Sequence, residues 1–147
     1  MSSHPAVHVV AVFSPERATA DFLKRALDSA GFASFTAPRE LGRLEAFIGA
    51  IQPHAVVVDM AMATETAWQE LMRVRSSPAW DEDVALVLTT PDESGLRQWM
   101  TGPRSGEPAV VEMFTHANDL RELRQAVVTA VQKKRGAASP RPRRRAS

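Results

Sequence analysis

A short apolar run that ends in an aspartate constrains this chain more than any other segment. Residues 54–59 read His-Ala-Val-Val-Val-Asp, and Pro53 stands directly before them. A continuous run of β-branched residues predicts a strand of a parallel sheet that is buried on both faces. Asp59 would then lie at the carboxyl end of that strand, where α/β proteins place their ligand chemistry. An aspartate can equally cap the loop or helix that follows, so this pattern alone leaves both interpretations open.

Strand-like and helix-like segments alternate along the rest of the chain. The predicted strands cover residues 7–13, 32–36, 54–59, 84–88 and 109–114, and the predicted helices cover residues 15–30, 41–51, 68–76, 91–100 and 120–131. Ser14 is the predicted N-cap of the first helix, Pro15 its first residue and Gly31 its end. Five strands alternating with five helices predict an α/β fold: a doubly wound five-stranded parallel sheet with helices on both faces.

The predicted fold brings polar residues together at one edge of the sheet. The carboxyl ends of the first, third, fourth and fifth strands meet there. These ends carry Ser14, Asp59, Thr89 and a residue between Val111 and Phe114. The sequence therefore predicts a functional edge built from these positions.

Length and composition exclude several classes of protein. A chain of 147 residues without cysteine predicts one domain with neither disulfides nor thiolate metal sites. No stretch approaches the roughly 18 to 20 apolar residues of a membrane span, and the first residues do not resemble a secretory signal. We therefore expect a cytoplasmic protein without membrane contact.

The charge is distributed unevenly along the chain. Seven basic residues and no acidic residue follow Gln132, so subtracting them from 18 leaves 11 basic against 17 acidic residues in 1–132, a balance of −6. We expect a domain over residues 1–134 and a disordered basic tail over residues 135–147. Such a tail can be solvated without a dedicated partner, or it can bind nucleic acid weakly and non-specifically.

Three stretches together resemble a known family. They are Val-Val-Val-Asp-Met-Ala-Met at 56–62, Ala-Leu-Val-Leu-Thr-Thr at 85–90 and Leu-Asp-Ser-Ala-Gly-Phe at 27–32. With the order of elements, they make residues 6–133 similar to the CheY-like receiver domain of bacterial two-component response regulators. The resemblance implies that Asp59 is the phosphoacceptor for a histidine kinase and that the Thr89 hydroxyl contacts the phosphoryl group. It also implies phosphorelay signal transduction by a protein that is not itself an enzyme.

The chain departs from the family where the phosphoryl chemistry needs its partners. Ser14 and Pro15 stand where the family has an acidic pair that holds Mg²⁺. We expect no cofactor, and Mg²⁺ only if the neighbouring Glu16 forms a site with Asp59. No lysine can stand directly at the end of the fifth strand, because the only lysines are residues 24, 133 and 134. Val110 stands where the family has a switch aromatic.

These departures favour a pseudo-receiver that signals through protein contacts. The resemblance places its partner face on the fourth helix, fifth strand and fifth helix, a face that could also form a homodimer. The candidate contacts there are Leu96, Trp99, Met100, Arg121 and Arg124. Two alternatives stay open: a receiver phosphorylated at Asp59 with weak metal dependence, and a flavodoxin-like module that binds a small ligand at the same edge.

Overall fold

The computed structural model describes residues 8–60, 64–81, 83–90, 113–115 and 120–138. Its five strands are β1 (Val9–Phe13), β2 (Ala33–Thr36), β3 (Ala55–Asp59), β4 (Ala85–Thr89) and β5 (Met113–Thr115). They form one sheet in the order β2-β1-β3-β4-β5, and every neighbouring pair is parallel. The predicted doubly wound parallel sheet is confirmed.

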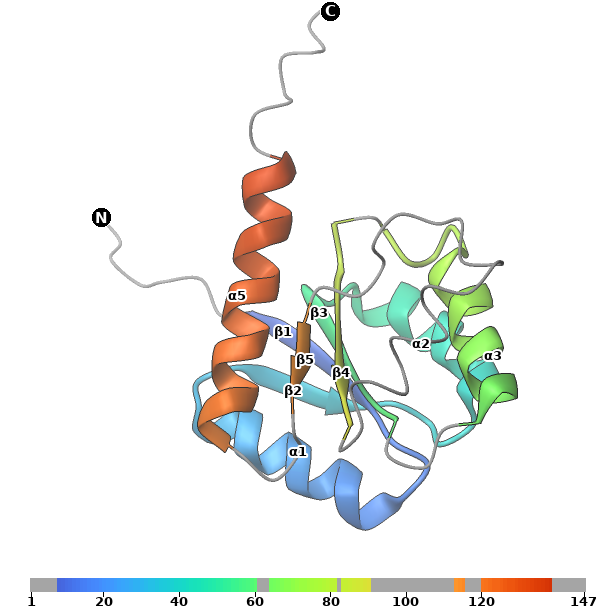
Figure 1. Ribbon diagram of the computed structural model, residues 1–147, viewed down its shortest axis with the longest axis horizontal. Helices are drawn as coiled ribbons and strands as arrows, with labels where there is room; N and C mark the ends of the chain where they lie inside the picture. The colour runs from blue at the N-terminus through green and yellow to red at the C-terminus, as the bar shows by residue number, and fades with distance from the viewer. Residues whose placement is uncertain (1–7, 61–63, 82, 91–112, 116–119, 139–147) are drawn as a thin grey trace, which may run out of the picture.

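Helices cover both faces of this sheet (Figure 1). They are α1 (Arg17–Ser29), the short 3₁₀ helix η1 (Leu41–Arg43), α2 (Leu44–Ile51), α3 (Glu65–Arg75) and α5 (Leu120–Ala138). α1 and α5 lie on one face, and α2 and α3 lie on the other. The helix predicted at 91–100 lies outside the described residues.

Successive side chains of the buried strands point to opposite faces of the sheet, so the core has two layers. Val10 and Val12 of β1 pack with Leu23 of α1 and Val127 of α5. Ala11, next to them on β1, faces the layer of α2 and α3, because successive side chains of a strand point to opposite faces. β3 and β4 are buried along their whole length, which explains the unbroken apolar runs that predicted them.

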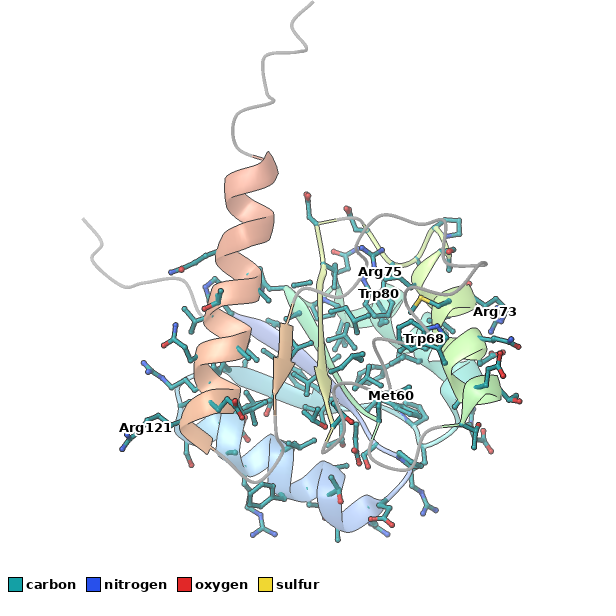
Figure 2. All side chains as sticks on the ribbon, viewed as in Figure 1. Met60, Trp68, Arg73, Arg75, Trp80 and Arg121 are labelled. Carbon is teal, nitrogen blue, oxygen red and sulfur yellow. The ribbon has the colours of Figure 1, made fainter. Side chains whose placement is uncertain are left out.

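Trp80 anchors the end of the segment that joins α3 to β4. Its indole Nε1 donates a hydrogen bond of 3.1 Å to the Val84 carbonyl, and the Arg75 guanidinium lies 5.2 Å from the centre of the Trp80 ring. Figure 2 shows Arg75 and Trp80 together on the α3 side of the sheet. The bond satisfies a buried polar atom on each side.

The start of α1 corrects the sequence-based prediction. Glu16, in an extended conformation, occupies the N-cap position and Arg17 is the first helical residue, so Ser14 and Pro15 precede the helix. Ser14 Oγ accepts from the Glu16 N–H, which lies ahead of the first helical turn, so it does not cap the N–H groups of the helix itself. The other end of α1 agrees with the prediction: Gly31 follows the C-cap with φ 100°, which a residue without Cβ adopts most easily.

The end of α5 also differs from the prediction. The helix continues to Ala138, so residues 135–138, which the sequence placed in a disordered tail, are helical. Gly136 lies within this last part of the helix, and one glycine costs a helix only about 1 kcal/mol. Within the described residues, no helix is long and apolar enough to cross a membrane.

Candidate functional site

A hydrogen bond between Ser14 and Asp59 forms the centre of the functional edge. Asp59 is the last residue of β3, and Ser14 directly follows β1, whose Phe13 is paired with Val58. This register brings the two side chains together, and Ser14 Oγ donates to Asp59 Oδ2 over 2.8 Å. Ser14 is 1% exposed and Asp59 is 8% exposed, so water has little access to the bond.

The Ser14 hydroxyl also orders the backbone that leads into α1. Its oxygen accepts a hydrogen bond of 3.0 Å from the Glu16 backbone N–H. One side chain therefore ties the loop after β1 to the carboxylate at the end of β3. The sequence placed Ser14 at this edge but assigned its hydroxyl to a helix cap, because an N-cap is recognised locally whereas a contact across 45 residues is not.

Thr89 occupies the corresponding place at the end of β4. It is paired with Asp59 in the sheet register, and its carbonyl accepts a hydrogen bond of 2.9 Å from the Met60 N–H. Its side chain is 0% exposed, and Oγ1 has no hydrogen-bond partner among the described residues. A buried hydroxyl thus lies one strand away from the Asp59 carboxylate.

The residue of β5 that lies level with Thr89 is Thr115. The sequence prediction looked for this position between Val111 and Phe114 and was therefore too early in the chain. The difference has a simple reason: strand pairing, and not the apolar pattern, decides which residue of a strand reaches the edge. Val111 itself, like Val110, lies outside the described residues.

Among the described residues, the donors at this edge differ from those that Mg²⁺ usually takes. Such an ion usually takes one or two carboxylates with water and phosphate oxygens, in octahedral geometry. Ser14 and Pro15 supply no carboxylate, and a Glu16 carboxylate oxygen, Oε1, accepts a long hydrogen bond of 3.4 Å from Thr19 on α1. No group of three histidine, aspartate or glutamate side chains in the described ranges could hold a metal ion. Among the described residues, Asp59 is the carboxylate that ends a strand at this position.

Solved structures identify the fold. The signal receiver domain of NarL from Mycobacterium tuberculosis superposes with a TM-score of 0.66 at 19% identity, over 87% of this chain and 98% of the other. The chain has the receiver-domain fold. A response regulator from Thermotoga maritima gives a TM-score of 0.64 at 20% identity, over 86% and 99% of the two chains. The chemotaxis protein CheY4 of Vibrio cholerae gives 0.62 at 14% identity, over 87% and 98%.

Comparison of the sequence alone gives no match. No protein-family model matches the chain, and no curated protein does. The expected resemblance to CheY-like receiver domains is therefore confirmed at the level of structure.

Of the five candidate contacts on the predicted partner face, the two on α5 lie within the described residues. Arg121 and Arg124 are exposed there, and Figure 2 shows Arg121 pointing away from the body of the receiver fold. The other three candidates, Leu96, Trp99 and Met100, lie outside the described residues. The exposed arginines are available to a partner, but the same is true of many surface residues, so their role stays a prediction.

Proposed function

We propose that this protein acts in response-regulator signal transduction as a pseudo-receiver: it keeps the receiver fold but works through protein contacts instead of a metal-dependent phosphoryl switch. The observation that carries the proposal is the Ser14–Asp59 hydrogen bond. A neutral hydroxyl holds the carboxylate at the place where the receiver resemblance implies acidic residues and Mg²⁺. The protein would have no enzymatic activity of its own.

The chemistry of phosphoryl transfer supports this reading. The transferred group carries negative charge, and enzymes stabilise it with metal ions and cationic side chains placed in advance. Lys24 is the lysine nearest to the functional edge in sequence, but its ammonium lies 2.7 Å from the carboxylate of Asp28 on α1. Removing one preorganised donor commonly costs about 3 kcal/mol of transition-state stabilisation. Asp59, without the metal clamp and the lysine, should therefore accept a phosphoryl group slowly or not at all.

The partner would be a signalling protein of the same pathway, either a histidine kinase or a downstream protein, in the cytoplasm. The exposed Arg121 and Arg124 of α5 fit an acidic surface on such a partner. The same face could pair two copies of the chain. Replacing both arginines with glutamate should then weaken the association of the chain with its partner or with a second copy. Arg25→Glu, at an exposed position of α1, would serve as a control in which an arginine outside this face is changed.

The decisive experiment asks whether Asp59 can form a complex with Mg²⁺ and beryllofluoride, a mimic of an aspartyl phosphate. Fluorine NMR would detect bound beryllofluoride in the wild-type protein, in Asp59→Asn and in the double variant Ser14→Asp with Pro15→Asp. We expect no bound signal from the wild type. The double variant supplies the missing carboxylates and should gain a Mg²⁺-dependent signal, which a further Asp59→Asn change should remove.

The wild-type result decides between the proposal and its main alternative. A saturable, Mg²⁺-dependent signal from the wild type that disappears in Asp59→Asn would overturn the pseudo-receiver and identify a phospho-accepting receiver. The double variant guards against a false negative, because it shows that the site can bind the mimic once its ligands are present. Circular dichroism would confirm that each variant is folded.

A further inference from the structure

The outer side of β2 is an open side of the sheet. β2 stands at the end of the strand order, and among the described residues no strand pairs with its outer side. The N–H groups of Ala33 and Ala37 donate to carbonyls of the β1 segment. Because backbone groups of alternate residues point to opposite sides of a strand, the N–H groups of Ser34 and Thr36 point outward, away from β1. An open side of this kind can add a strand from another chain.

A second copy of the chain is the partner that this open side would fit. A two-fold axis beside β2 would place the same strand of another copy next to it in the antiparallel direction, so that the outward groups of both copies pair with one another. Phe35, between Ser34 and Thr36, is 46% exposed, and such pairing would cover part of this apolar surface. The open side of β2 is therefore a surface for self-association unless something closes it.

Asp28 of α1 occupies the outward N–H of Ser34. The Oδ1 atom of Asp28 accepts a hydrogen bond of 3.1 Å from the Ser34 backbone N–H and a second bond from the Ser34 hydroxyl. Ser34 is only 3% exposed, whereas the next residue, Phe35, is exposed. A side chain of the same chain thus takes the place that the backbone carbonyl of an added strand would need.

Lys24, one turn earlier on α1, holds the Asp28 carboxylate in this position. Its ammonium lies 2.7 Å from Asp28 Oδ2, so one carboxylate oxygen faces Lys24 and the other faces β2. The hydrogen bonds from Lys24 and Ser34 hold the pKa of the Asp28 carboxyl below its usual 3.8, so at neutral pH the acceptor is charged. A charged acceptor forms a stronger hydrogen bond than the neutral carbonyl of a competing strand.

We infer that Asp28, held in place by Lys24, closes the open side of the sheet and prevents β2 from pairing with β2 of a second copy. Charged side chains beside an open strand are a common protection against such pairing, because a second strand can approach only after they lose their water and their partners. β2 and β5 stand at opposite ends of the strand order. The inference therefore concerns a different strand from the predicted partner face and does not rest on the proposed function.

Sedimentation velocity of the full chain over a series of concentrations tests the inference. Asp28→Ala removes the acceptor and frees the Ser34 N–H in both copies, so self-association should become about tenfold tighter than in the wild type. Asp28→Asn keeps a side-chain oxygen that can accept from Ser34 and should associate like the wild type. Asp21→Ala, the matched control, removes a carboxylate from an exposed position of the same helix and should also leave association unchanged.

A second change locates the new contact on β2. Thr36→Pro deletes the outward N–H of Thr36, which an added strand would need, so combining it with Asp28→Ala should abolish the gain in association. The tenfold gain should persist when Arg121 and Arg124 are both changed to glutamate. This background separates pairing through β2 from any pairing through α5.

Hydrogen exchange of the wild-type protein gives a test that needs no variant, and it applies even if Asp28→Ala does not fold. The Ser34 amide, bonded to Asp28, should exchange more slowly than the outward amide of Thr36. Three results would overturn the inference: equal exchange rates for these two amides, an Asp28→Ala variant that associates no more tightly than Asp21→Ala, and a gain in association that survives Thr36→Pro. Circular dichroism would show whether each variant is folded.

Discussion

Replacing Ser14 with alanine tests whether the hydrogen bond at the functional edge stabilises the fold. The change removes the donor to Asp59 Oδ2 and the acceptor for the Glu16 N–H, at 2.8 and 3.0 Å. It leaves the backbone and the neighbouring strands untouched. Ser14 precedes α1, so the substitution does not alter a helix cap.

The expected loss can be estimated from the two bonds. A hydrogen bond to a charged group contributes about 1.5 to 3 kcal/mol, and the bond to Asp59 is buried on both sides. Asp59 has at least one further interaction, so its carboxylate is not left alone, which favours the lower half of this range. The Glu16 N–H is partly buried and water can replace part of its bond. We expect Ser14→Ala to lower the free energy of unfolding by about 2 kcal/mol, or the melting temperature by about 6 °C.

Urea unfolding, followed by far-UV circular dichroism, would measure this loss. A double-mutant cycle with Asp59→Ala assigns it to the Ser14–Asp59 pair, because Ser14→Ala should cost about 1.5 kcal/mol less when the carboxylate is already gone. Ser29→Ala, the same substitution at an exposed position of α1, is the matched control and should stay within about 0.5 kcal/mol of the wild type.

The reasoning fails if Ser14→Ala unfolds at the same urea concentration as Ser29→Ala. It also fails if the cost of Ser14→Ala is the same with and without the Asp59 carboxylate. The first result would mean that water replaces the bond, and the second that Ser14 stabilises only the loop at Glu16.

Three further changes test other parts of the structure by the same unfolding measurement. Thr89→Val replaces a buried hydroxyl that has no partner among the described residues, so it should raise the unfolding free energy by about 1 kcal/mol; a loss would refute this. Trp80→Phe removes the buried bond to the Val84 carbonyl and should cost about 1 to 2 kcal/mol, so an unchanged midpoint would contradict it. The Lys24 ammonium is hydrogen-bonded to Asp28 and holds the pKa of that carboxyl below its usual 3.8. The stabilisation of the fold by the ionised Asp28 is therefore present above pH 3.8, and it is lost as the pH falls through the lowered folded-state pKa. Asp28→Asn should therefore be less stable than the wild type at neutral pH and equal to it in strong acid, whereas a pH-independent difference would exclude this cause.

Several features could be predicted from the sequence because they depend on local pattern. An unbroken apolar run marks β3 and β4 as strands buried on both faces, and it places Asp59 and Thr89 at their ends. Gly31 marks the end of α1, since the turn there has a positive φ. The absence of a lysine directly after the fifth strand needs no structure at all, because it follows from the positions of the three lysines in the sequence.

The bond between Ser14 and Asp59 was decided by the tertiary structure. Nothing near Ser14 distinguishes a helix cap from a donor to a carboxylate 45 residues away, and only the pairing of β1 with β3 makes the second role possible. Thr115 is level with Thr89 for the same reason, since β4 and β5 set their register through backbone hydrogen bonds. Apolar periodicity records which side of a strand is buried, but it carries no information on which residue of another strand lies beside it.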